Sequence, residues 1–186
     1  QSEVSDQSEH SRAKFIGRVF QDPLKGTASS MKVYENLAIG FRRDKNRGFN
    51  WGIKEFEMDY YNNLLQSLNL GLESKLNSRI GDLSGGQRQV LTLLMATLQK
   101  PKLLLLDEHT SALDPKTSRI IMERTENIIK KNQLTALMIT HNMQDAINFG
   151  DRLILMHDGK IALDIKGQDK QKFKISDLLE KFEEIK

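Results

Sequence analysis

Short apolar runs alternate with longer amphipathic stretches along this chain of 186 residues. The apolar runs at residues 14–21, 102–108 and 135–141 are too short for helices, and each predicts a buried strand. The amphipathic stretches predict helices over residues 31–40 and 55–68, from residue 115 onward and over the tail from residue 176. Because strands alternate with helices, the pattern predicts an α/β fold with a parallel sheet.

Two local signals mark where elements begin or turn. Asp114 stands directly before Pro115, and an acidic cap followed by proline is typical of a helix start. Residues 152–165 form two strand-like runs on either side of Asp158 and Gly159, which predicts a β-hairpin with a tight turn. These signals give the expected limits of one long helix and one hairpin.

The stretch DLSGGQRQV, residues 82–90, puts two glycines where a helix must begin. Ser84 can cap this helix while Gln87 reaches back to the cap, as in a capping box. Gly85 and Gly86 leave the first amide groups uncovered, and the positive end of the helix dipole adds to their attraction for an anion. Taken alone, the stretch is more often an ordinary helix start after a tight turn. The rest of the sequence must therefore decide whether an anion binds there.

Polar side chains end the predicted strands. Asp107 and Glu108 lie at the carboxyl end of the second strand, the end at which open α/β sheets bind their ligands. One carboxylate there can hold Mg²⁺, and the next can orient or deprotonate an attacking water. His141 ends the third strand, and Gln21 ends the first. Considered one at a time, each is explained as well by a structural or solvated polar residue.

Composition narrows the possible classes without choosing one. The formal net charge is +3 and the isoelectric point is about 9.0, too weakly basic to indicate nucleic-acid binding without a localised patch. The chain has no cysteine, which excludes disulfides and thiol chemistry. Its longest apolar run, residues 90–98, is about half of the roughly 20 residues that a bilayer-spanning helix needs.

Five motifs in one order carry a family resemblance. FQDP, LSGGQ, LLLLDE, SALD and ITHN follow one another, with 20 positions from Gln87 to Asp107 and 34 from Asp107 to His141. The series resembles the Q-loop, signature, Walker B, D-loop and H-loop of the ATP-binding-cassette (ABC) ATPases, from about residue 15 to residue 165. The resemblance implies the ABC type of P-loop NTPase fold, a parallel sheet with a helical subdomain.

In that family the strand ends surround ATP and Mg²⁺, so the resemblance implies a role for each polar residue. Gln21 would contact Mg²⁺ and the attacking water, and Asp107 would support Mg²⁺. Glu108 would be the catalytic base, and His141 would contact the γ-phosphate. The sequence departs from the family at His109, where members usually carry proline.

The resemblance also implies a homodimer, because the family's ATP is held between two nucleotide-binding domains. The signature residues of one copy would face the ATP of the other; they are Ser84, Gly85, Gly86 and Gln87. Asp114 and its D-loop neighbours would connect the two sites. On this interpretation the glycines are bare so that a γ-phosphate from the partner can approach them.

The phosphate-binding loop G-x-x-x-x-G-K-[ST] does not occur in these 186 residues. We therefore expect an ABC domain that lacks its N-terminal Walker A portion, the alternative being a natural protein without this loop. The expected parts are a helical, permease-docking subdomain (22–82), a core from the signature to the H-loop (83–165) and a C-terminal helix (166–186). Losing three or more phosphate contacts would cost roughly 5 kcal/mol, so we expect no tight ATP binding or hydrolysis by this chain alone.

The resulting hypothesis is the ATP-hydrolysing subunit of an ABC transporter, of the bacterial importer type. It would be cytoplasmic and peripheral on the inner face of the cell membrane. Its partners would be a second nucleotide-binding domain, transmembrane permease subunits and an extracytoplasmic substrate-binding protein, with no nucleic acid. Phrases such as GRVFQDPLKGTA look most like an importer subfamily linked to aromatic amino acids or small peptides.

Two other functions stay open at this point. A soluble ABC ATPase that acts on ribosomes or nucleic acid would carry the same motifs. A truncated chain would not be an enzyme and would have a structural or dominant-negative role. One basic and aromatic loop could contact a permease, lipid headgroups or RNA, although a solvated loop explains it equally well. This loop contains Arg42, Arg43, Lys45, Arg47, Phe49 and Trp51.

Overall fold

The computed structural model describes residues 3–43 and 52–184, and the chain divides into two compact units, Gln1–Ile139 and Thr140–Lys186. The elements of the first unit are α1 (Glu9–Arg12), β1 (Ile16–Val19), η1 (Pro23–Gly26), α2 (Val33–Phe41), α3 (Glu55–Gln66), η2 (Leu72–Lys75), η3 (Ile80–Asp82), α4 (Gly85–Thr97), β2 (Leu103–Asp107), α5 (Pro115–Asn132) and β3 (Thr135–Ile139). Those of the second are α6 (Met143–Asn148), β4 (Arg152–His157), β5 (Lys160–Lys166), α7 (Gln168–Lys172) and α8 (Ile175–Glu184).

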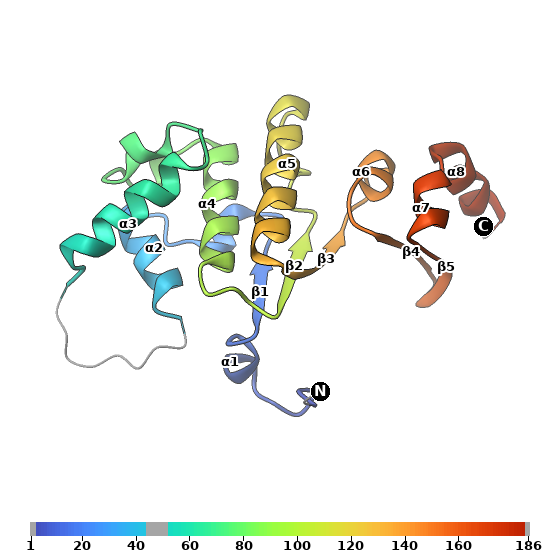
Figure 1. Ribbon diagram of the computed structural model, residues 1–186, viewed down its shortest axis with the longest axis horizontal. Helices are drawn as coiled ribbons and strands as arrows, with labels where there is room; N and C mark the ends of the chain where they lie inside the picture. Colours follow the sequence, from blue (N-terminus) through green and yellow to red (C-terminus); the bar gives the residue numbers. More distant parts are fainter. Residues whose placement is uncertain (1–2, 44–51, 185–186) are drawn as a thin grey trace. The chain divides into compact units, whose positions relative to one another are not determined.

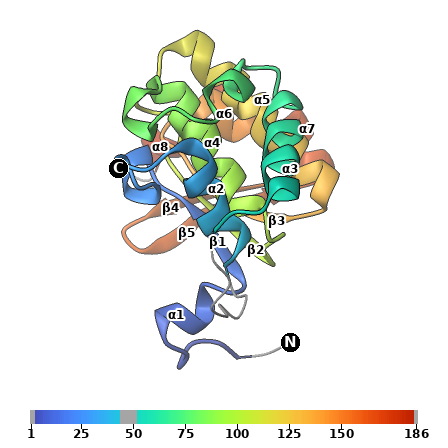
Figure 2. The ribbon, with the colours of Figure 1, turned by 90° about the vertical axis from the view of Figure 1, so that its left-hand side faces the viewer.

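The sheet of the first unit is parallel, with its three strands in the order β1–β2–β3 (Figure 1). In this register Leu104 of β2 pairs with Gly17 on one side and with Ala136 on the other. Helix α1 lies beyond the start of β1 in both views (Figures 1 and 2). The predicted α/β fold with a parallel sheet is therefore confirmed, and each strand is shorter than the apolar run that predicted it.

Strand β2 is buried mainly through alternate residues. Leu104 and Leu106 are 0% and 2% exposed, whereas Leu103 and Leu105 on the opposite face are only partly buried. The prediction of a buried strand therefore holds fully for one face of β2 and only in part for the other. β1 alternates in the same way, with Val19 in the core and Arg18 exposed.

The prediction that β3 is a buried strand is wrong. Leu137 is 50% exposed and Ile139 is 56% exposed, and Met138 alone in this strand is partly buried. Within residues 3–43 and 52–184, no strand pairs with the side of β3 that faces away from β2. An apolar run predicts that a strand needs cover, but it does not state which segment supplies the cover.

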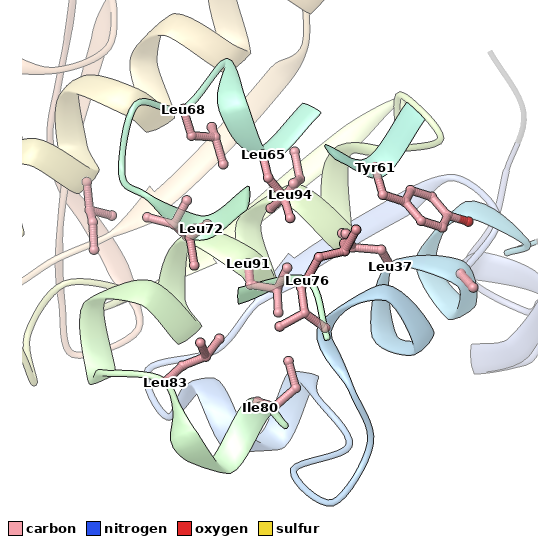
Figure 3. Close-up of a cluster of buried hydrophobic side chains, with 14 residues drawn as sticks. Leu37, Tyr61, Leu65, Leu68, Leu72, Leu76, Ile80, Leu83, Leu91 and Leu94 are labelled. Carbon is pink, nitrogen blue, oxygen red and sulfur yellow. The ribbon is translucent and has the colours of Figure 1, made fainter. Parts of the chain in front are cut away.

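The larger apolar cluster of the first unit joins the helices that precede β2 to Ile121 of α5 (Figure 3). Leu37 of α2, Tyr61 and Leu65 of α3, and Leu91 and Leu94 of α4 all contribute buried side chains to it. The predicted helices at 31–40 and 55–68 are confirmed as α2 and α3, with ends that differ by at most two residues. This cluster fixes α4 to α2 and α3 through about five large apolar side chains, each worth about 1.5–3 kcal/mol when fully buried.

The second unit contains the predicted hairpin, in which β4 and β5 are antiparallel. Asp158 and Gly159 both have positive φ, 45° and 72°, as the type I′ turn of a two-residue hairpin requires. The Nζ of the buried Lys170 donates to the carbonyls of Ile147, Phe149 and Gly150 at 2.6–3.0 Å. One ammonium group therefore satisfies three carbonyls at the end of α6, which positions α7 against it.

The tail helix α8 begins at Ile175, close to the predicted start, and Leu178 is its buried residue. Across the described part of the chain, every helix is too short or too polar to span a bilayer.

Candidate functional site

Strand β2 ends in a strained backbone turn at Glu108. The φ of Glu108 is 42°, in the left-handed region that residues other than glycine rarely adopt. Its amide donates to the carbonyl of Ile139 at 3.0 Å, so the end of β3 holds the turn in place. Such a conformation costs of order 1–3 kcal/mol, and strain of this kind concentrates at functional sites.

Asp107, the last residue of β2, forms an ion pair that sequence reasoning missed. Its Oδ2 accepts a hydrogen bond from Nη2 of Arg18 at 3.0 Å, and the Arg18 guanidinium also lies 4.5 Å from the centre of the Phe20 ring. Both ends of the pair are partly exposed, so it adds at most about 1 kcal/mol to stability. The sequence feature that could have indicated this pair is Arg18 itself, a single arginine within an apolar run, on the face of β1 that points away from the core.

Gln21 is connected to the same turn through Ser111. The Gln21 amide donates to Oγ of Ser111 at 3.1 Å, and this hydroxyl donates to the Glu108 carbonyl at 2.8 Å. The structure thus links the Gln21 side chain, through Ser111, to the backbone of Glu108 at the carboxyl end of the sheet, and the roles of the two residues stay predictions. The sequence analysis identified Ser111 only as the first residue of the SALD motif. Its position between Gln21 and Glu108 became visible only in the structure.

The predicted capping box at the start of α4 is confirmed. The backbone amide of Gln87 donates to Oγ of Ser84, and the backbone amide of Ser84 donates to Oε1 of Gln87, each at 3.2 Å. The helix begins at Gly85, so the uncovered amides of the first turn belong to the glycine pair.

The two glycines of this turn are explained differently. A Cβ at Gly86 would clash with Cγ2 of Thr117 on α5, so packing inside the chain is itself a reason for glycine there. A Cβ at Gly85 would lie 3.5 Å from Cδ2 of Leu113, an ordinary contact. Packing therefore explains the glycine at position 86 but not the one at position 85, where the approach of a partner's phosphate stays a prediction.

Asp114 caps α5 as predicted. Its Oδ1 accepts a hydrogen bond from the Thr117 amide at 3.0 Å, and Pro115 occupies the first turn. Hydrogen bonds from Thr117 hold the pKa of Asp114 below its ordinary value. The carboxylate is exposed and ionised at neutral pH, next to the glycine-bearing start of α4 that contacts Thr117.

His109, the departure from the family pattern, is a core residue. It is 2% exposed, and burial lowers its pKa to about 4, so the ring is neutral. Its Nε2 lies 3.2 Å from Oγ1 of Thr125, whose hydroxyl donates to the carbonyl of Ile121. Because the one hydroxyl proton is used there, Nε2 of His109 is the donor.

His141 belongs to the second unit. It is exposed and stands directly before Asn142, whose Oδ1 caps α6 by accepting from the amides of Gln144 and Asp145. The convergence of His141 with Asp107 on one pocket stays a prediction.

The basic and aromatic loop is described only at its start. Lys45, Arg47, Phe49 and Trp51 lie outside the described residues, while Nη2 of Arg42 pairs with Glu57 at 2.7 Å. In the two described stretches, no group of three or more acidic, histidine or cysteine side chains is placed to hold a metal ion by itself.

Comparisons with known proteins agree with the motifs. The profile of the family described as ABC transporter matches residues 1–111. The tyrosine transport ATP-binding protein of Clostridioides difficile (strain R20291) is 43% identical over 183 residues, which cover 97% of this chain and 71% of that relative. The aliphatic sulfonates import ATP-binding protein SsuB of Albidiferax ferrireducens is 38% identical over 134 residues, 72% of this chain and 43% of that protein.

Solved structures give the same answer. The ADP conformation of an ATP-binding cassette of an ABC transporter superimposes with a TM-score of 0.75 and 26% identity, covering 98% of this chain and 74% of that one. A dimeric ATP-binding cassette in a post-hydrolysis state, bound to ADP and Pi, gives a TM-score of 0.69 and 28% identity, with 87% and 68% covered.

This chain belongs to the ABC transporter family, as an ATP-binding subunit. Members of this class bind and hydrolyse ATP to power transport, and they act as dimers on transmembrane permease subunits. The transporter interpretation is thereby favoured over a soluble ABC ATPase of ribosomes or nucleic acid.

Proposed function

We propose that Gln21, Asp107 and Glu108 form the hydrolytic part of an Mg²⁺–ATP site. The observation that carries the proposal is the strained turn at Glu108, which Ser111 connects to Gln21. Backbone strain clusters at active sites, and here it falls on a residue that carries a carboxylate at the end of a strand, which supports a role in chemistry for Glu108.

The donor set fits a magnesium ion that keeps most of its ligands from phosphate and water. Such an ion needs only one or two protein carboxylates, and Asp107 supplies one at the end of β2. Asp107 would hold the ion or one of its waters, while its Oδ2 accepts a hydrogen bond from Arg18. When bound, Mg²⁺ would neutralise part of the negative charge on the phosphate groups.

Three side chains would carry out the other steps of hydrolysis. Glu108 would accept the proton of the attacking water, and the Gln21 amide would hold that water in line. His141 would donate a hydrogen bond to the terminal phosphate. Ser111 is hydrogen-bonded both to the Gln21 side chain and to the backbone carbonyl of Glu108. This bridge supports a coupled movement, in which a shift of Gln21 displaces the turn that carries Glu108.

The signature residues would complete the site of a second copy. Ser84, Gly85, Gly86 and Gln87 present the amides of the first turn of α4, an arrangement that favours a phosphate group. Asp114 would lie next to this interface, because its helix packs against the start of α4 at Thr117.

For the whole protein we infer import through a separate permease. The names of the relatives, tyrosine transport and aliphatic sulfonates import, support an importer, and the first supports an aromatic amino acid as cargo. Residues 22–82 would dock the permease from the cytoplasmic side of the membrane, and an extracytoplasmic binding protein would deliver the substrate.

The test joins this chain to a segment that carries a G-x-x-x-x-G-K-[ST] loop and measures ATP turnover. We expect the chain alone to be inactive and the fusion to hydrolyse ATP. Glu108→Gln in the fusion should lower kcat at least about 100-fold while ATP still binds, because general-base catalysis contributes about 10²–10⁴-fold. Glu123→Gln, an exposed carboxylate on α5, is the matched control. Unchanged turnover in Glu108→Gln would remove Glu108 as the base.

A further inference from the structure

Helix α6, which follows His141 in the second unit, is too short to be stable by itself. It has six residues, whereas an isolated helix is only marginally stable in water below about 12–15 residues. None of its six residues is buried, so apolar packing holds it less firmly than it holds the helices of the first unit. The position of α6 therefore depends strongly on the hydrogen bonds at its two ends.

The N-terminal end of α6 fixes the backbone around His141. Oδ1 of Asn142 accepts hydrogen bonds from the backbone amides of Gln144 and Asp145 at 2.9 and 3.1 Å. The backbone amide of Asn142 in turn donates to Oγ1 of Thr140 at 3.0 Å. These bonds engage the residues on both sides of His141, so the direction of its side chain depends on where α6 lies.

The C-terminal end of α6 is held by Lys170 of α7. Its Nζ donates to the carbonyls of Ile147, Phe149 and Gly150, at 2.6, 2.8 and 3.0 Å, and its side chain is 5% exposed. The last carbonyls of a helix have no partner within the helix, so an outside donor is needed to satisfy them. The ammonium group has three N–H donors and uses all of them here, which leaves none for a ligand. Its arrangement therefore fits a role in holding α6 in place.

Helix α7 is itself fixed to the hairpin of β4 and β5, because it follows β5 after a single residue. That residue is Gly167, whose backbone amide donates to the carbonyl of Asp151, the residue directly before β4, at 3.0 Å. Next to it, Arg152 of β4 donates from Nε and Nη2 to both carboxylate oxygens of Asp164 of β5, at 2.8 and 2.6 Å. Lys170 thus joins a short helix to a cross-linked hairpin.

We propose that Lys170 is a positioning residue for His141, an inference that rests on the proposed contact between His141 and the terminal phosphate. The ammonium group holds the far end of α6, and the Asn142 cap carries that position to His141. Without Lys170, three carbonyls lose their donor and so short a helix frays. The His141 ring then lies in the wrong place, and a misplacement of about 1 Å can cost about 100-fold in rate.

The first test follows the ring signals of the four histidines of the full chain by carbon–proton NMR, with His141 assigned by its loss in His141→Gln. Lys170→Met should shift the His141 signal and move the amide signals of residues 142–149 toward their positions in an unfolded chain. The amide signals of β4 and β5 should stay in place. Lys172→Met, an exposed lysine on the same helix, is the matched control and should change none of these signals.

Two results of this test would overturn the proposal. One is a His141 signal that does not move in Lys170→Met. The other is a loss of the hairpin signals together with those of α6, which would make Lys170 a general stabiliser of the unit.

The second test measures ATP turnover in the Walker A fusion. Lys170→Met should lower kcat at least about tenfold, and it should cause no further loss in a His141→Ala background, because it acts only through that ring. A further tenfold loss in the double variant would contradict the proposal. Unchanged turnover in His141→Ala alone would instead contradict the proposed role of His141, and the NMR result would then decide by itself whether Lys170 fixes the ring.

Discussion

Strands β2 and β3 are neighbours of the same length, and their residues pair from Leu103 with Thr135 to Asp107 with Ile139. Their sequences are similarly apolar, yet Leu104 is fully buried and Leu137 is half exposed. The difference lies in what packs on them. β2 is paired on both sides and its inner face meets Leu93 and Ala96 of α4, whereas β3 is paired with β2 only, among the described residues.

The ends of the two strands differ in the same way. β2 leads into the strained Glu108 and the buried His109. The backbone of Glu108 is hydrogen-bonded to Ile139, and the ring of His109 is hydrogen-bonded to Thr125. β3 leads into Thr140 and His141, which belong to the second unit. The candidate site residues at the end of β2, the better packed strand, are therefore held by more hydrogen bonds within the first unit than those at the end of β3.

The largest expected effect comes from the core of β2. Leu104→Ala should lower the free energy of unfolding by about 2–5 kcal/mol, because it leaves a cavity in a fully buried site. Leu137→Ala in β3, its matched control, should cost within about 0.5–1 kcal/mol. Urea denaturation followed by circular dichroism measures both. Equal losses in the two variants would show that β3 is as well covered as β2.

A second effect concerns pH at the end of β2. The pKa of His109 is about 4 in the folded chain and near 6.5 when unfolded, so the unfolded chain binds the extra proton as pH falls. Stability from this group is complete above pH 6.5 and is lost as the pH falls toward 4. Between pH 7 and pH 5 the chain should lose about 2 kcal/mol more than His109→Gln does, by denaturant titration at each pH. Parallel pH curves for the two proteins would show that His109 is not buried as a neutral ring.

The smallest effect is expected at the strained turn. Glu108→Gly should raise the free energy of unfolding by about 1 kcal/mol, because glycine adopts a positive φ without strain. The same variant of the Walker A fusion should lose ATP hydrolysis. Glu108→Ala, which keeps the strain and removes the carboxylate, is the control for stability. A destabilised Glu108→Gly chain would mean that contacts of the side chain outweigh the backbone strain.

Much of the fold and part of the site could be predicted from the sequence because the signals are local. The caps at Ser84 and Asp114 and the turn at Asp158–Gly159 each depend on residues within a few positions of one another. The order of the motifs gave the family, because that order reflects how strand ends meet in this class of sheet.

What the sequence did not predict depends on contacts between distant residues. The pairing of Arg18 with Asp107, the clash that explains Gly86 and the exposure of β3 require knowledge of which segments meet. The hydrogen bond from Nη2 of Arg43 to the carbonyl of Ala96 is of the same kind, because it joins residues 53 positions apart.

The most direct test of the account mixes two variants of the Walker A fusion, Glu108→Gln and Gly85→Arg, and measures ATP turnover. Each variant alone should be inactive, since both of its composite sites are damaged. We predict that the mixture regains roughly a quarter of the unsubstituted rate, because half of the dimers are mixed and one of their two sites is intact. A mixture as inactive as its components would contradict a site built from Glu108 of one copy and the signature glycine of the other.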